Sequence, residues 1–110
     1  MAYVSQWDGS KTTGSALFSA GPFSTTNNGG SDGLEAFTIN TGNLSLTPGG
    51  VYVLFFSASN LFDGEEGQAE WGRVITNPYS GGDFVFDNNG NNFGLLTTNA
   101  WDQTGDNVQD

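Results

Sequence analysis

The sequence predicts an all-β fold, and three features of its composition and patterning support that prediction. Gly is abundant, at 17 of 110 residues, and the chain holds nine Phe, three Tyr and three Trp. Short apolar runs end at Gly, Asn, Asp, Ser or Pro, as strands do, and no run has helical periodicity. Val51–Phe56 (VYVLFF) is apolar at every position, so we expect a central strand covered on both faces. The expected architecture is an antiparallel β-sandwich, jelly-roll-like, forming a single domain over residues 1–110.

About eight short strands are expected along the chain. Their fairly regular spacing favours a sandwich or barrel over a fold built from βαβ units. The expected ranges are Ala2–Trp7, Ala16–Ser19, Glu35–Asn40, Asn43–Leu46, Val51–Ser59, Ala69–Ile75, Asp83–Phe86 and Phe93–Leu96.

The residues between these ranges have the chemistry of turns. A hairpin turn is expected in the run WDGSKTTG, which follows the first strand. In Thr47-Pro48-Gly49-Gly50, Pro presets φ at the second position and Gly accepts a positive φ at the third. Thr41-Gly42 separates two short strands, and Asn89-Gly90 is the strongest hairpin signal in the chain. The turns therefore agree with the strand assignment.

The charge balance excludes one class of partner. Twelve Asp and Glu stand against two Lys and Arg, which gives a formal net charge of −10. Such a surface repels phosphate backbones, so nucleic-acid binding is excluded. The acidity is explained either by solubility in a salty or extracellular setting or by binding of a divalent cation. The sequence contains no apolar run long enough for a signal peptide or a membrane span.

The segment Phe37–Asn60 carries a family resemblance. It reads Phe-x-x-Asn-Thr-Gly-x-Leu-x-Leu-Thr-x-Gly-x-x-Tyr-Val and then Phe-x-Ser-x-Ser. The runs YVSQWD from Tyr3, YSGGDFVF from Tyr79 and LTTNAWD ending at Asp102 fit the same pattern. From Tyr3 to Asp102 the chain resembles a domain of secreted bacterial proteins that carry a PEP-CTERM sorting tail. The resemblance implies an extracellular β-sandwich of unassigned function and assigns no functional residues.

The same resemblance implies that the chain is a truncated piece of a longer domain. The sorting tail, a Pro-Glu-Pro motif with an apolar anchor and a basic end, is not in this sequence. Relatives have further strand sequence before Tyr3 and after Trp101-Asp102. An edge strand without its neighbour invites pairing with another copy, so we expect a homodimer through a sheet edge. The expected location is secreted or at the cell surface of a bacterium.

The residue types leave little room for catalysis. Because the chain has no His and no Cys, Ser-His-Asp and Cys-His nucleophiles and ordinary zinc sites are excluded. A two-carboxylate glycosidase is a distant alternative, through Glu65, Glu66 and Glu70 in or beside the loop Asp63–Gly67. Loop carboxylates in an acidic protein are usually only solvated. The sequence therefore favours a non-catalytic structural or interaction module.

Calcium is the one cofactor for which the sequence offers ligands. In DNNGNN, the oxygen-bearing side chains of Asp87, Asn89 and Asn91 alternate, as a hard cation requires. An Asn-Gly hairpin explains the same residues without a metal. Both interpretations stay open at the level of the sequence.

A carbohydrate-binding module is the alternative function. Exposed Trp or Tyr rings stack on pyranose rings, while Asn, Asp and Glu bind the hydroxyls. Trp71 and Tyr79 are the best candidates, with Arg73 and Glu70 beside Trp71. The simpler interpretation is that all three Trp are core residues. The expected partner is accordingly a polysaccharide or another surface protein.

Overall fold

The computed structural model describes residues 1–24, 26, 31–61 and 81–103. Within those ranges the protein is all-β as predicted, since its regular elements are strands and short 3-10 helices. In chain order they are β1 (Ala2–Trp7), β2 (Thr12–Ala20), β3 (Tyr52–Phe56), η2 (Ser59–Leu61), β4 (Val85–Phe86), η3 (Phe93–Thr97) and β5 (Asp102–Gln103).

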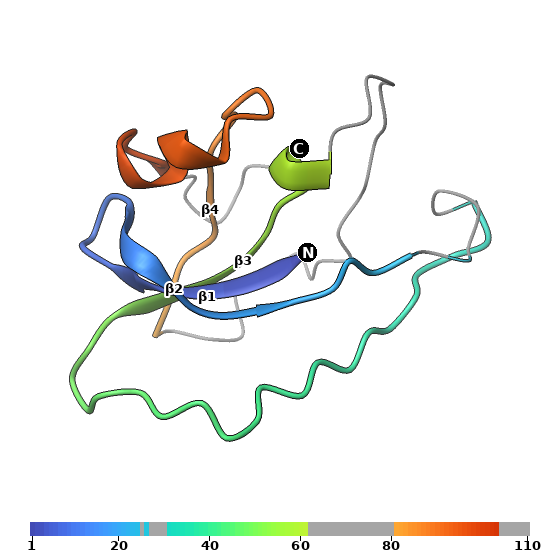
Figure 1. Cartoon of the computed structure of the whole chain (residues 1–110), viewed down its shortest axis with the longest axis horizontal. Coiled ribbons are helices and arrows are strands. Elements are labelled where there is room, and N and C mark those ends of the chain that lie inside the picture. The colour runs from blue at the N-terminus through green and yellow to red at the C-terminus, as the bar shows by residue number, and fades with distance from the viewer. Residues whose placement is uncertain (25, 27–30, 62–80, 104–110) are drawn as a thin grey trace.

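The strands form two antiparallel sheets. One has three strands in the order β2-β1-β3, and the other pairs β4 with β5. In Figure 1, η3 lies on one side of the three-stranded sheet, and the segment 31–50 passes on the other side as a wide arc. Val4 is paired with Phe18 on one side and with Leu54 on the other, so these three side chains share a face.

The predicted hairpin turn between β1 and β2 is confirmed. The Asp8 N–H donates to the Lys11 carbonyl at 3.1 Å, and Gly9 has a φ of +101°. The Asp8 carboxylate fixes the turn, because its Oδ1 accepts from the backbone N–H of Ser10 at 2.8 Å and of Lys11 at 2.9 Å. An aspartate at this position therefore stabilises the turn through its own side chain.

An aromatic core lies between the three-stranded sheet and η3. The Tyr3 and Phe55 rings stack with centroids 5.1 Å apart, and the edge of Trp101 meets Phe55 at 5.2 Å. The core residues alternate with exposed ones along β3, where Val53 and Phe55 are buried and Leu54 is 64% exposed. Buried in this cluster are Tyr3, Val53, Phe55, Leu96 and Trp101, with Met1, Trp7, Val85 and Phe93 packed against it.

The position of the apolar strand differs from the prediction. Among the described residues, β1 is the central strand of the sheet, and β3 pairs with β1 alone. An apolar run predicts burial but does not fix which neighbours a strand has, and the register of β3 places Leu54 on the face opposite the core.

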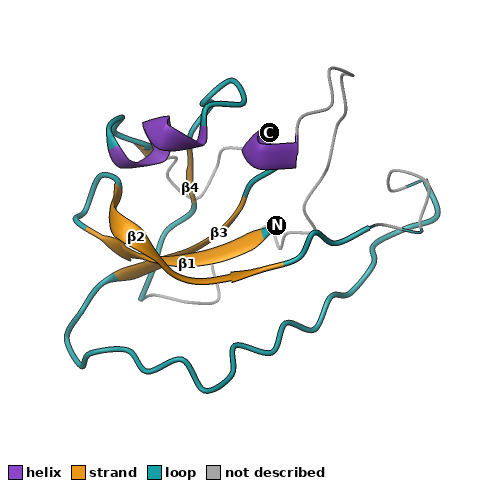
Figure 2. Ribbon diagram, in the orientation of Figure 1, coloured by secondary structure: helices purple, strands orange, loops and turns teal. Residues whose placement is uncertain are grey.

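Two predicted strands, Glu35–Asn40 and Asn43–Leu46, are loop in the structure. Figure 2 shows the segment 31–50 as loop throughout, and none of its described residues joins a sheet. Alternating apolar residues become a strand only when a neighbouring strand offers backbone partners. The turns in this segment are as predicted: Gly42 has a φ of +64°, and the Gly50 N–H donates to the Thr47 carbonyl at 3.0 Å.

The predicted strand Phe93–Leu96 is wrong, because these residues lie in η3. Asn92 caps the helix, with its Oδ1 accepting from the Gly94 N–H at 3.1 Å. Short polar side chains at this position favour a helical turn over an extended one. The predicted Ala16–Ser19 and Val51–Ser59 correspond to β2 and β3 with other ends, and Asp83–Phe86 contains the shorter β4.

The strand β5 was not expected from the sequence, and the predicted strand Ala69–Ile75 lies outside the described residues. None of the described helices has the length and hydropathy needed to cross a membrane.

Candidate functional site

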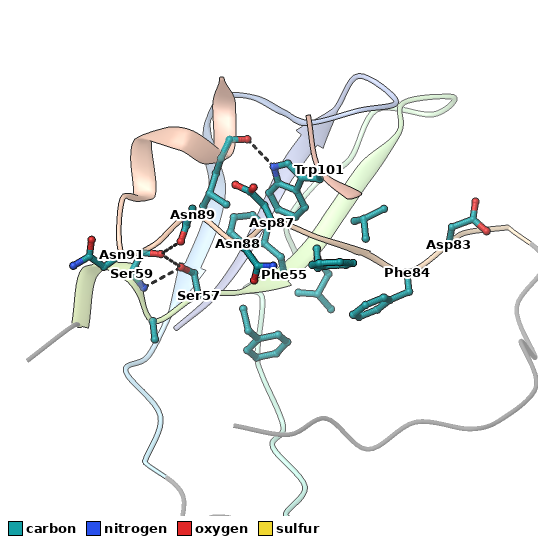
Figure 3. Close-up of a pocket in the computed structure, with 16 residues that line it drawn as sticks. Phe55, Ser57, Ser59, Asp83, Phe84, Asp87, Asn88, Asn89, Asn91 and Trp101 are labelled. Carbon is teal, nitrogen blue, oxygen red and sulfur yellow. Dashed lines mark hydrogen bonds between the residues drawn. The ribbon is translucent and has the colours of Figure 1, made fainter. Parts of the chain in front are cut away.

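A cleft of about 780 Å³ opens between the end of β3 and the segment 83–91 (Figure 3). Its apolar lining consists of Leu54, Phe55, Phe56, Ala58, Phe84, Val85, Phe86, Leu96 and Trp101. Its polar lining consists of Ser57, Ser59, Asp83, Asp87, Asn88, Asn89 and Asn91. Apolar and aromatic surface with a few polar groups is the usual composition of a small-ligand site.

Local turn chemistry places the polar residues at one end of the cleft. After β3 ends, Ser57 Oγ accepts from the Ser59 N–H at 3.1 Å and starts η2. On the opposite wall, the Asn92 N–H donates to the Asn89 carbonyl at 3.0 Å. Gly90 and Asn91 both have positive φ, of +53° and +64°, as a type I′ turn requires. A turn is therefore present here, but the hairpin predicted at Asn89-Gly90 is wrong, because the turn leads into η3 and not into a second strand.

A hydrogen-bonded chain joins the two walls. Ser57 Oγ donates to Ser59 Oγ at 2.9 Å, and Ser59 Oγ donates to Asn89 Oδ1 at 2.9 Å. Figure 3 shows this chain at one end of the cleft. Ser59 and Asn89 are 30 positions apart in the sequence and lie on opposite walls. Their hydrogen bond therefore fixes the width of the cleft at this end.

The aromatic lining has a fixed part and an exposed part. Trp101 is buried, and its Nε1–H donates to the Leu96 carbonyl at 2.9 Å, so its ring is held in place. Phe84 is 58% exposed and stacks on Phe86 with centroids 6.3 Å apart. The exposed ring of Phe84 is aromatic surface that a ligand in the cleft can reach.

Asp87 is the polar group of this site that most needs a partner. Its Oδ2 is buried and has no hydrogen-bond donor among the described residues. Burial raises the pKa of the Asp87 carboxyl, and the negative charge of Asp102 raises it further. Asp102 lies close because it is paired with Phe86, the residue before Asp87, across β4 and β5. A buried acceptor of this kind attracts a hydrogen-bond donor or a cation.

The three predicted calcium ligands, Asp87, Asn89 and Asn91, all line the cleft. Asn89 Oδ1 already accepts from Ser59, and in Figure 3 the Asn91 side chain points away from Asp87. The structure therefore brings these residues to one wall without directing their oxygens to a common point. Over the described ranges, no group of three or more Asp, Glu, His or Cys is placed to hold a metal ion.

The other predicted site residues, Trp71, Arg73, Tyr79 and Glu70, lie outside the described residues, as do Glu65 and Glu66. Sequence analysis did not identify the cleft residues Ser57, Ser59, Phe84 and Trp101 as a site. The alternation in DFVFD, which places Phe84 and Phe86 on one face, was the available signal for the aromatic part.

Comparison of the chain with protein-family models, with curated proteins and with solved structures found no match. A function for this site is therefore argued from its own geometry.

Proposed function

We propose that this chain is a non-catalytic extracellular binding module whose ligand lies in the cleft between β3 and β4. The ligand class that fits best is a neutral polysaccharide. The C–H faces of a sugar ring can stack on the exposed ring of Phe84, and its hydroxyls can donate to the carboxylate of Asp87. An anionic ligand fits less well, because the described lining holds carboxylates and no cationic side chain.

The observation that carries this proposal is the unpartnered Oδ2 of Asp87. A buried acceptor that lacks a donor costs folding free energy, about 1–3 kcal/mol for a typical group. Because this oxygen is closed to solvent in the free chain, the wall of the cleft has to move before a ligand hydroxyl can donate to it, and that hydrogen bond would then remove the penalty. Such a charge-assisted hydrogen bond contributes more than one between neutral groups.

Affinity electrophoresis in gels that contain soluble β-glucan, mannan, xylan or starch tests the proposal. We expect retardation by at least one of these neutral polysaccharides. Asp87→Asn should weaken binding about tenfold, because a charged acceptor becomes a neutral one. Phe84→Ala should weaken it roughly twofold to tenfold through loss of the ring contact.

Phe37→Ala is the matched control for Phe84→Ala. Phe37 is also an exposed ring, at 43%, but it lies outside the cleft and packs against Phe23. Its removal should leave retardation unchanged. Absence of retardation by every polysaccharide, or equal loss in both Phe variants, would contradict the proposal.

Calcium binding is a second candidate for the same end of the cleft. It is favoured by the proximity of the Asp87 and Asp102 carboxylates, whose repulsion a divalent cation would relieve. Thermal melts with millimolar Ca²⁺ and with chelator test it. A site saturated at one hundredfold its dissociation constant adds about 2.7 kcal/mol. Equal melting temperatures under the two conditions would exclude calcium.

We further infer an antiparallel sandwich of jelly-roll type, in a protein secreted or displayed at a bacterial surface. The family resemblance of Phe37–Asn60 and the packing of one face of the three-stranded sheet against the core support this inference. Another surface protein is the alternative partner of the module. Detection by antibody on intact cells or in culture medium tests the location, and signal only after lysis would contradict it.

The glycosidase alternative depends on Glu65, Glu66 and Glu70, which lie outside the described residues. Turnover of a polysaccharide that is abolished by Glu65→Gln or Glu70→Gln would establish it in place of the binding module.

A further inference from the structure

The outer edge of β2 offers backbone groups that no described strand occupies. The β2-β1-β3 order leaves β2 at the edge of the sheet. Trp7 N–H donates to the Val51 carbonyl and Ser57 N–H donates to the Met1 carbonyl, so odd-numbered residues of β1 bond β3. Even-numbered residues of β1 therefore bond β2, including Val4, whose partner is Phe18.

Ser19 lies between Phe18 and Ala20, which face β1, so its N–H and C=O groups point away from β1. The same alternation, continued by one residue, directs those of Leu17 outward too. Within the part of the chain that the structure describes, neither residue has a backbone partner on that outer side. Both side chains are exposed, Leu17 at 43%. These donors and acceptors are spaced along an extended strand, and the structure that satisfies such a row is another β-strand.

β2 also lacks two of the features that usually prevent edge pairing, namely charged side chains and proline. Its nine residues, TTGSALFSA, include no charged side chain and no Pro. Its pairing with β1 is irregular between Thr13 and Phe18, so a bulge ends at Leu17 and the regular register covers Phe18, Ser19 and Ala20. In a chain with a net charge of −10, this uncharged strand is where a second copy can approach without setting carboxylates against each other.

We propose that two copies of the chain pair through the Leu17–Ser19 edge of β2, antiparallel and about a two-fold axis at Phe18. In that register, Leu17 of one copy lies opposite Ser19 of the other, and each pair exchanges backbone hydrogen bonds. The same edge is self-complementary, as a two-fold interface requires. The pairing joins the two three-stranded sheets into one continuous sheet.

The side chains agree with this register. Phe18 of one copy would lie directly opposite Phe18 of the other, and a cross-strand aromatic pair of this kind stabilises an antiparallel sheet. Phe18 is half-buried and shares its face with Val4 and Leu54. The apolar face of each sheet would therefore continue across the interface.

Charge-swap variants at the two exposed positions test the proposal by analytical ultracentrifugation. The wild-type chain should sediment as a dimer at micromolar concentration. Leu17→Lys/Ser19→Lys places like charges opposite each other, as does Leu17→Asp/Ser19→Asp. Each variant alone should dissociate, with a dissociation constant higher by about tenfold or more. An equal mixture of the two variants should form heterodimers, because the introduced charges are then of opposite sign.

Leu34→Lys/Leu46→Lys makes the same change in charge at exposed leucines of the segment 31–50 and should remain a dimer. Far-ultraviolet circular dichroism checks that every variant is folded. Recovery of the dimer in the equal mixture is a second check, because unfolded chains could not form it. A monomeric wild type would overturn the proposal, since the edge would then be satisfied within one chain. Wild-type-like dimers of the two like-charged variants would overturn it as well.

Discussion

At the scale of single residues, two aspartates show how local surroundings decide what a carboxylate does for the fold. Asp8 is exposed, and hydrogen bonds from the Ser10 and Lys11 N–H groups lower its pKa. Asp87 has a buried oxygen to which no described residue donates, and burial raises its pKa. The charge of Asp8 therefore favours the folded chain, and the charge of Asp87 opposes it.

Asp87→Asn is expected to raise the melting temperature at pH 7. Because the pKa of Asp87 is raised, the folded chain holds this proton more tightly than the unfolded chain does. The penalty is fully present above the raised pKa and absent below the ordinary value of about 3.9. The gain should therefore disappear in acid, as followed by thermal melts across pH. A variant less stable than the wild type at pH 7 would contradict this expectation.

Asp8→Ala is expected to lower the melting temperature at pH 7. Since the pKa of Asp8 is lowered, its stabilisation is present above about pH 3.9 and is lost as pH falls through the lowered value. Asp8→Asn keeps an oxygen acceptor for the turn, so its melting temperature should lie between those of the wild type and Asp8→Ala. Asp32→Ala, at an exposed site, controls for the change in net charge. Equal melting temperatures for Asp8→Ala and Asp32→Ala would show that the turn hydrogen bonds contribute nothing.

At the scale of elements, the carbonyl of Leu96 attaches η3 to the rest of the fold. Thr12, at the start of β2, is 2% exposed and donates through Oγ1 to that carbonyl at 2.7 Å. Trp101 donates to the same oxygen through its Nε1–H. One backbone acceptor thus joins the first hairpin, η3 and Trp101 in the lining of the cleft.

Thr12→Val is expected to destabilise the fold by about 0.5–1.5 kcal/mol, the usual contribution of one hydrogen bond. Thr97→Val is its control, because Thr97 donates to the Gly94 carbonyl on the exposed side of η3. Urea unfolding of both variants measures the difference. Tryptophan fluorescence should report the change at Trp101 in the Thr12 variant only. Equal unfolding midpoints for the two variants would contradict this role of Thr12.

The sequence was informative where residues decide structure locally. Ala2–Trp7, the hairpin turn at Asp8 and the Pro48-Gly49 turn depend on neighbours in the chain, and all are found as predicted. Glu35–Asn40 has the alternation of a strand, but pairing depends on a distant partner that alternation cannot specify. For the same reason the cleft was missed, since the contact of Ser59 with Asn89 follows from tertiary packing.

At the scale of the whole molecule, charge and apolar surface set opposite tendencies. The chain has twelve carboxylates and only two basic side chains, so the carboxylates repel one another in any compact state. Exposed apolar side chains, Leu54 at 64% and Phe84 at 58% among them, favour association. The contacts proposed above lie where this balance favours association, at the apolar lining of the cleft and at the uncharged edge of β2.

Salt should therefore stabilise the folded chain. Raising ionic strength from 0.01 M to 0.15 M shortens the Debye length from about 30 Å to about 8 Å, which screens the carboxylates from one another. Each kcal/mol of relieved repulsion corresponds to a rise of roughly 4 °C in melting temperature for a domain of this size. The Leu17→Lys/Ser19→Lys variant, measured with chelator present, separates screening from dimer formation and from cation binding. Sodium chloride and tetramethylammonium chloride should act alike, because only ionic strength matters for screening. A melting temperature that falls with salt, or that rises with sodium alone, would show that self-repulsion does not limit the stability of this fold.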